Sequence, residues 1–143
     1  MRSLLDVNVL LALLDASHIH HMLAISWWKQ HHRQGWASCP LTQNAVVRIM
    51  SSPGYQQRQP PAMVAERLAL ATSHVDHEFW PDSLSLLEPG LLKWDRVTGT
   101  RQVSDIYLVA LAVKNGGRLV TLDQGISVHA VRGASSKHLL TLL

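Results

Sequence analysis

Two short apolar runs that each end on an aspartate place the strongest constraint on how this chain can fold. The run "RSLLD" ends on Asp6, and the run "RLVTLD" ends on Asp123. Apolar runs of this length, bounded by polar or turn-forming residues, are typical of strands buried on both faces of a parallel sheet. Because ligands bind at the edge formed by the carboxyl ends of parallel strands, we expect both carboxylates to lie at one site.

Strand-like and helix-like segments alternate along the chain. The pattern predicts strands at residues 2–5, 35–40, 77–80 and 119–122, followed by a final apolar stretch at 138–143. Helical periodicity is predicted at residues 9–14, 20–32, 41–51, 60–73 and 105–114. Thr42 and Ser104 are the predicted N-caps of two of these helices, and two short helical pieces are expected around Pro89 and Gly90. Alternation of this kind favours an α/β fold, with a parallel sheet covered by helices on both faces.

Length and composition indicate one globular domain over residues 1–143. The chain is long enough to bury a core without a disulfide or a structural metal. Hydrophobic residues make up 47% and charged residues 16%, which argues against a disordered chain. The formal net charge of +3 is compatible with a nucleic-acid partner and does not require one.

The sequence also predicts where the protein acts. Cys39 is the only cysteine, so an internal disulfide is impossible, and it reads as a buried core thiol in a reducing compartment. No apolar run is long enough to cross a membrane, and Asp6 and Asn8 interrupt the apolar start that might otherwise resemble a signal peptide. We therefore expect a cytoplasmic protein that does not associate with membranes.

A third acid, Asp105, lies at the predicted start of a helix and can project toward the same edge of the sheet. Carboxylates that share a partly dry site raise one another's pKa, so such a cluster favours a compensating cation. Mg²⁺ prefers oxygen ligands, and the chain offers no thiolate site. Each acid also has a simpler interpretation: Asp6 with Asn8 as a helix cap, Asp105 as a partner of the helix dipole, and Asp123 as a turn former.

Several longer motifs resemble PIN-domain ribonucleases of the VapC type, the toxin half of bacterial toxin–antitoxin pairs. They are "LLDVNVLLALL", "HIHHMLAISWW", "CPLTQNAVVRIM", "HEFWPDSLSL" and, most specifically, "VSDIYLVALAVKNGGRLVTLDQGI". Together they extend over nearly the whole chain. The resemblance implies a three-layer α/β/α PIN-like domain that cleaves RNA with Mg²⁺ or Mn²⁺, a cognate antitoxin as partner, and a homodimer.

The resemblance also implies roles for individual residues. Asp6 and Asp105 match the first and second metal-binding aspartates of the family, and Asp123 matches a further acid after the fourth strand. Thr121 matches a hydroxyl residue that often stands two places before that acid. Gln43 stands where the family commonly has a glutamate, and its neutral amide can offer a carbonyl ligand but cannot act as a base.

Two alternatives to an active nuclease remain open at this point. In the first, Gln43 has weakened the metal site and the PIN scaffold survives as a binding partner. In the second, the acids belong to a phosphoacceptor receiver domain, but "LLDVN" lacks the paired acids and "HLLTLL" lacks the lysine that such a domain needs.

Other polar and aromatic residues suggest binding surfaces. Arg48, Arg101 and Arg118 are candidates for phosphate contacts with RNA, since the guanidinium group donates hydrogen bonds in pairs. Adjacent Trp27 and Trp28 cannot both face the core of one helix, so one of them is predicted to cover a partner surface. "HIHH" has helical metal-ligand spacing but no further ligand beside it, so we expect packing or capping there.

Overall fold

A computed structural model describes residues 1–143 and contains one five-stranded, fully parallel sheet. The strands are β1 (Ser3–Leu5), β2 (Trp36–Ser38), β3 (His77–Phe79), β4 (Arg118–Thr121) and β5 (Leu139–Thr141). Their order across the sheet is β3-β2-β1-β4-β5. From β1, the chain therefore adds β2 and β3 on one side of the sheet, and then β4 and β5 on the other side. The reversal falls between β1 and β4, the two strands that end in the aspartate motifs.

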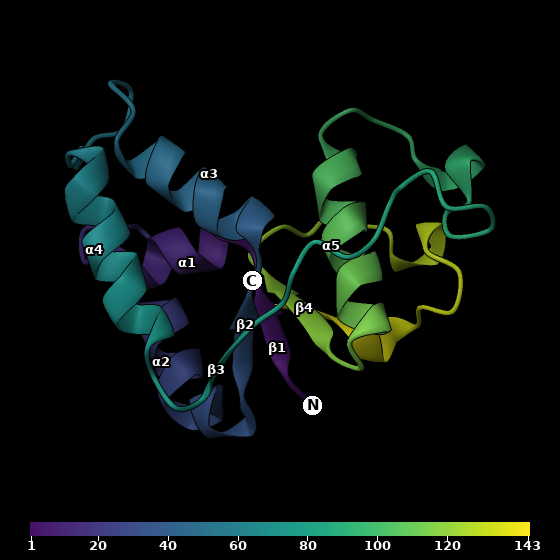
Figure 1. Cartoon of the computed structure of the whole chain (residues 1–143), viewed down its shortest axis with the longest axis horizontal. Helices are drawn as coiled ribbons and strands as arrows, with labels where there is room; N and C mark the ends of the chain where they lie inside the picture. Colours follow the sequence, from purple (N-terminus) through teal and green to yellow (C-terminus); the bar gives the residue numbers. More distant parts are fainter.

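Helices cover both faces of the sheet and give the predicted three layers. They are α1 (Val7–Leu14), α2 (His21–His31), α3 (Pro40–Met50), α4 (Pro61–Thr72) and α5 (Gln102–Lys114). Four short 3₁₀ turns, η1 to η4, occupy His32–Gln34, Trp94–Arg96, Val128–Ala130 and Ser136–His138. Figure 1 shows α1 to α4 grouped on one side of the strands and α5 with the C-terminal loops on the other. The expected α/β architecture with a central parallel sheet is confirmed.

The alternation of side chains along the strands produces two separate hydrophobic cores. Leu4 and Leu119 are paired neighbours that pack against α5, whereas Leu5 and Val120 pack on the opposite face among α1 to α4. All four side chains are fully buried. Neither face of β1 or β4 is solvated, which explains why both strands read as continuous apolar runs.

Two helices begin earlier than the sequence predicted, and both predicted N-caps are wrong. Helix α3 starts at Pro40 with Cys39 at its N-cap, and Thr42 lies inside the first turn. There the Thr42 hydroxyl oxygen accepts a hydrogen bond from the backbone N–H of Cys39 at 3.1 Å. Helix α5 starts at Gln102, so the exposed Ser104 lies within the helix and not at its boundary.

The segment around Pro89 and Gly90 also differs from the expectation of two short helical pieces. It forms turns, followed by an isolated antiparallel bridge between Leu92 and Val131 and then by η2. The bridge ties this segment to the loops that follow β4. None of the helices combines the length and the apolar character needed to cross a membrane.

Candidate active site

Asp6 lies directly after β1 and is held by bonds to two elements. Its extended backbone caps α1, and its Oδ1 atom accepts a hydrogen bond of 2.7 Å from the backbone N–H of Val7. Its own backbone N–H donates to the carbonyl oxygen of Val120 on β4 at 2.9 Å. Asp6 is only 4% exposed, and this burial raises its pKa.

Thr121, the last residue of β4, connects Asp6 to the neighbouring strand end. Its buried hydroxyl donates to Asp6 Oδ2 at 2.7 Å and accepts from the Asn8 side-chain amide at 3.2 Å. The same oxygen accepts from the backbone N–H of Asp123 at 3.0 Å. Asn8 in turn accepts from the backbone N–H of Leu122 at 3.0 Å. These bonds fix the ends of β1 and β4 relative to each other.

Asp105 brings a third carboxylate to this place from the first turn of α5. Its pKa is raised to about 7, mainly by burial and also by the negative charges of Asp6 and Asp123 and by a hydrogen bond with Asp123. Because charges act on a pKa only at short range, Asp105 lies near both Asp6 and Asp123 at this edge of the sheet. The three side chains offer only oxygen atoms, the donors that hard divalent cations prefer.

Asp123 is the exposed member of this acidic cluster, the name we use for Asp6, Asp105 and Asp123. Its Oδ1 atom accepts from the backbone N–H of Gly125 at 2.8 Å, so it also forms the turn that its sequence context predicted. The carbonyl oxygen of Gly125 accepts from the side-chain amide of Gln102 on α5 at 3.2 Å. Gln102 therefore helps to hold the turn beside α5, a role that nothing in the sequence had indicated. For Asn8 the sequence predicts only a helix cap, whereas its side chain bonds to Thr121 and to Leu122.

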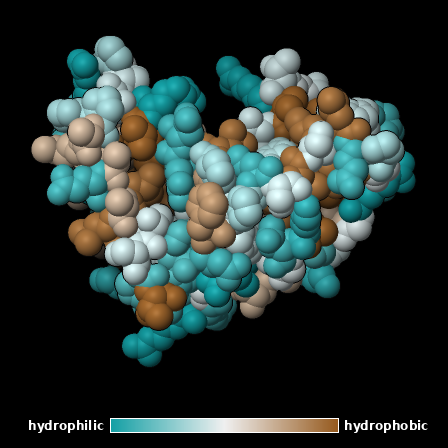
Figure 2. Space-filling model, in the orientation of Figure 1, coloured by the Kyte–Doolittle hydropathy of each residue, from teal (hydrophilic) through white to brown (hydrophobic).

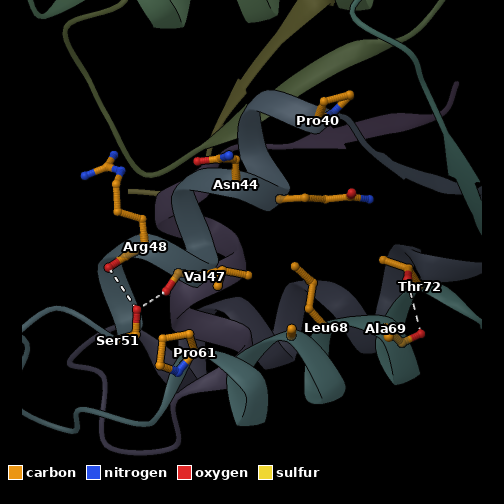
Figure 3. A pocket seen from close by; sticks show the side chains of 11 residues that line it. Pro40, Asn44, Val47, Arg48, Ser51, Pro61, Leu68, Ala69 and Thr72 are labelled. Atoms are coloured by element: carbon orange, nitrogen blue, oxygen red, sulfur yellow. Dashed lines mark hydrogen bonds between the residues drawn. The ribbon is translucent and has the colours of Figure 1, made fainter.

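Gln43 makes no hydrogen bond to the acidic cluster. Its side-chain amide donates to the Ser38 hydroxyl at 2.9 Å, and that hydroxyl is also 2.8 Å from Nε2 of His77. Gln43 lines a pocket between α3 and α4, with Asn44 and Arg48 among its other lining residues. In Figure 3, Asn44 and Arg48 lie on the same side of α3. The helix therefore turns Gln43 toward β2 and β3.

The three arginines lie in different parts of the molecule. Arg48 is exposed on α3, and Arg101 is exposed at the N-cap of α5, the helix that carries Asp105. Arg118 begins β4, so it lies at the end of the strand opposite Asp123, and its Nε donates to Ser3 Oγ at 3.1 Å. Of the three arginines predicted to contact phosphate, Arg118 thus lies at the edge of the sheet opposite the acidic cluster. Figure 2 shows the surface hollowed between the lobe of α3 and α4 and the lobe of α5.

The adjacent tryptophans differ in burial, and the histidines of "HIHH" make local contacts. Trp27 is buried in the core, whereas Trp28 is partly exposed and lines an apolar groove formed mainly by α1, α2 and α4. In "HIHH", Nδ1 of His18 accepts from the backbone N–H of His20, and Nδ1 of His21 lies 2.7 Å from the carbonyl oxygen of Ala12. These contacts are capping and packing contacts at the start of α2.

Comparison with known proteins assigns this architecture to a family. Residues 3–131 match the PIN domain, so the chain belongs to the PIN-domain family. The chain is 47% identical over 142 residues to Ribonuclease VapC44 of Mycobacterium tuberculosis strain H37Rv, an alignment that covers 99% of this chain and 100% of the relative. It is 42% identical over 134 residues to Ribonuclease VapC39 of the same strain, covering 93% and 96%.

A solved structure has the same fold at much lower sequence identity. It is a chain from the crystal structure of VapBC2 from Rickettsia felis bound to a DNA fragment from their promoter, with a TM-score of 0.57 and 13% identity. The superposition covers 86% of this chain and 89% of that chain. The resemblance to VapC-type PIN ribonucleases is thus confirmed by sequence over the full length, and the PIN fold by structure.

Proposed function

We propose that this protein is a metal-dependent endoribonuclease and the toxin of a toxin–antitoxin pair. The observation that carries the proposal is the acidic cluster, in which burial and neighbouring charge raise the pKa of Asp105 to about 7. Sequence identity of 47% and 42% to the ribonucleases VapC44 and VapC39, over nearly their full lengths, supports RNA as the substrate. The substrate of such an enzyme lies in the cytoplasm, which is where we propose that it acts.

A divalent cation fits the residues of the cluster. Three carboxylates in one partly buried place repel one another, and their donor atoms are all oxygen. Mg²⁺ or Mn²⁺ would be held by Asp6 and Asp105, with Asp123 holding the ion or its water ligands. A bound cation would supply positive charge that lowers the pKa of an attacking water and offsets the charge that develops on the phosphate.

The residues around the cluster prepare it for this chemistry. Thr121 and the backbone N–H of Val7 each donate to one carboxylate oxygen of Asp6, and so fix the orientation of that side chain. Asp105 makes no such fixed bond to the backbone, and in the metal-free protein its pKa is raised to about 7, so a bound cation would relieve the repulsion that its ionised form feels. Gln43 would act on the acidic cluster only indirectly, through its hydrogen bond to Ser38 on β2, the strand beside β1.

A second candidate is a weakened PIN scaffold that binds without cutting. It is favoured by one observation: the sequence of α3, "PLTQNAVVRIM", contains no carboxylate. If this helix must supply an acid, the cluster lacks one ligand. The two candidates make opposite predictions about cleavage, whereas both permit binding of a partner protein.

We also propose a cognate antitoxin and a homodimer as the partners of this chain. The structural neighbour from Rickettsia felis comes from a VapBC2 crystal structure, which supports a partner protein for this fold. The groove at Trp28 has nine hydrophobic residues among its eleven lining residues, and these include Leu10, Leu14 and Leu70. An exposed apolar groove of this kind suits the apolar face of a partner helix.

Cleavage of RNA by the purified protein separates the two candidates. The untagged protein, free of any antitoxin, is incubated with total RNA in Mg²⁺, in Mn²⁺ and in chelator. A nuclease produces discrete fragments only with a divalent cation, and addition of excess cation restores the activity after chelation. Intact RNA under every condition, from protein with a folded circular dichroism spectrum, would favour the binding scaffold.

A further inference from the structure

Three metal-ligating side chains meet at the edge of the sheet opposite the acidic cluster. His32 belongs to η1 after α2, and His74 and Asp76 belong to the connection between α4 and β3. One ligand atom of each side chain lies within 4.8 Å of those of the other two. Asp76 Oδ2 is 2.8 Å from Nδ1 of His32 and 3.5 Å from Nδ1 of His74.

The surrounding structure holds two of these three side chains in position. The carbonyl oxygen of Asp76 accepts from the backbone N–H of Trp36 at 2.9 Å and from Arg2 Nη1 at 2.8 Å, which anchors the connection to β2. The ring of His32 stacks on Trp28, with centroids 5.3 Å apart and planes inclined by 19°. Because the ligands are already ordered, little conformational freedom is lost when an ion binds.

The cluster is open to solvent on one side. The side chains of His32 and Asp76 are 23% and 20% exposed, whereas that of His74 is 48% exposed. An ion can therefore enter from the His74 side and keep a water ligand there. Arg2 places a positive charge beside Asp76, and its guanidinium also pairs with Glu78 at 3.3 Å. Glu78 thus offsets the charge that would otherwise oppose a cation next to Asp76.

The ligand set selects the class of ion. Two imidazole nitrogens and one carboxylate oxygen suit Zn²⁺ and neighbouring transition metals, whereas Mg²⁺ prefers oxygen ligands alone. Three protein ligands with water at the fourth position satisfy tetrahedral Zn²⁺. We propose that His32, His74 and Asp76 bind one Zn²⁺ ion at this edge of the sheet, independently of the acidic cluster.

Binding requires two local changes. The backbone N–H of Asp76 donates to Nδ1 of His74 at 3.2 Å, so coordination through this atom replaces that bond. His32 must present an unprotonated nitrogen in place of a hydrogen bond to Asp76. Zn²⁺ therefore competes with protons at both imidazoles, and its affinity falls at acidic pH.

Competition against a chromophoric chelator tests this site in the untagged, full-length protein. We expect wild type to bind one equivalent of Zn²⁺ and His74→Gln to bind it at least about tenfold more weakly, since even the loss of a hydrogen-bond partner of a metal ligand costs about that much. The matched control is His129→Gln, since His129 is also exposed and lies on η3, and it should match wild type. His32→Gln provides a second variant if His74→Gln is misfolded by circular dichroism.

The Asp105→Asn variant separates this site from the acidic cluster. This variant should still bind one equivalent of Zn²⁺, whether or not the protein cleaves RNA. Co²⁺ added in place of Zn²⁺ should quench the fluorescence of Trp28, which stacks on His32, in wild type and not in His74→Gln. Equal Zn²⁺ affinity in wild type and both histidine variants, or loss of the equivalent in Asp105→Asn, would overturn the proposal.

Discussion

The Thr121 hydroxyl makes three contacts in the acidic site. It donates to Asp6 and accepts from the side chain of Asn8 and from the backbone of Asp123. Thr121 is the last residue of β4. Since side chains alternate between the two faces of a strand, Thr121 and Leu119 share one face. A hydroxyl both donates and accepts, so neither valine nor alanine can replace it here.

Thr121→Val is expected to destabilise the protein and to weaken any cleavage. Valine keeps the shape of the side chain but leaves two donors and one acceptor without their partner, at a cost of about 1–3 kcal/mol. Urea unfolding measures that cost. Thr141→Val is the matched control, because Thr141 pairs with Thr121 across β4 and β5 but is partly exposed. Equal stability of the two variants would contradict this role of Thr121.

Asp105 should make the stability of the metal-free protein depend on pH. Its pKa is raised from 3.8 to about 7 in the folded state. Below about pH 4 the carboxyl group is protonated in both states. Between about pH 4 and pH 7 the unfolded chain releases the proton first, so the free energy of unfolding falls as the pH rises, and this decrease ends above about pH 7.

Urea unfolding at about pH 5 and about pH 8 measures this decrease. We expect a smaller decrease in Asp105→Asn than in wild type, since asparagine does not ionise. Mg²⁺ should also reduce the decrease in wild type, because a cation stabilises the ionised carboxylate. An identical pH dependence in wild type and Asp105→Asn would show that the pKa of Asp105 is not raised by folding.

Gln43→Ala should leave any cleavage activity within about threefold of wild type, the range of a substitution away from the reacting groups. The Gln43 side chain bonds to Ser38 and not to the acidic cluster. Initial rates on one RNA substrate provide the measurement. A loss of activity as large as that in Asp105→Asn would return Gln43 to the catalytic site that its sequence position implied.

The positions of these side chains in the fold differ in how well the sequence could predict them. Asp6 and Asp123 follow apolar strands directly, so the strand pattern alone assigned them to one edge of the sheet. Gln43 lies on a helix, where each residue turns the side chain by about 100°, so its direction depends on where the helix begins. Contacts such as that between Gln102 and Gly125 join residues far apart in sequence and leave no local pattern.

At the scale of helices and strands, the start of β4 depends on a glycine that precedes it, Gly117. A β-carbon at Gly117 would lie 2.5 Å from the backbone oxygen of Arg2 and 2.7 Å from the ring of Trp80. The preceding Gly116 has a φ of +70° and ends α5. The two glycines therefore let α5 turn directly into a strand that packs tightly beside β1.

Gly117→Ala should destabilise the protein by about 1–3 kcal/mol, the usual cost of overpacking a buried site. The backbone of Arg2 cannot move away without breaking the pairing between β1 and β4. Gly99→Ala is the control, since a β-carbon there meets no atom within 4 Å. Thermal unfolding of both variants tests the difference, and a neutral Gly117→Ala would mean that the strands are not packed this closely.

The existence of the helices was easier to predict than their first residues. Thr42 and Ser104 are good N-cap residue types, but α3 and α5 begin earlier, at Pro40 and Gln102. Proline is already favourable in a first helical turn, and the Gln102 side chain accepts from the Thr98 hydroxyl at 3.2 Å. At the first residues of α3 and α5, the preference of Thr42 and Ser104 for the N-cap position is thus outweighed by the residues that precede them.

At the scale of the whole molecule, the strand order brings the acids together. The alternation of elements predicted a parallel sheet, but it did not predict that β1 and β4 would be neighbours. That adjacency depends on which faces α1 and α5 cover, and both cores contribute to it. Asp6 and Asp123 follow adjacent strands, and α5 adds Asp105 from the other layer.

The central claim is that the acidic cluster carries the chemistry of RNA cleavage. Its most direct test measures initial rates of cleavage of one RNA in Mn²⁺ by wild type, Asp6→Asn, Asp105→Asn and Asp95→Asn. Asp95 is the control because it is an exposed acid on η2, outside the cluster. We predict losses of at least about a hundredfold in Asp6→Asn and Asp105→Asn and none in Asp95→Asn, in line with removal of groups that stabilise charge in the transition state. Cleavage by Asp6→Asn and Asp105→Asn at the wild-type rate would contradict it.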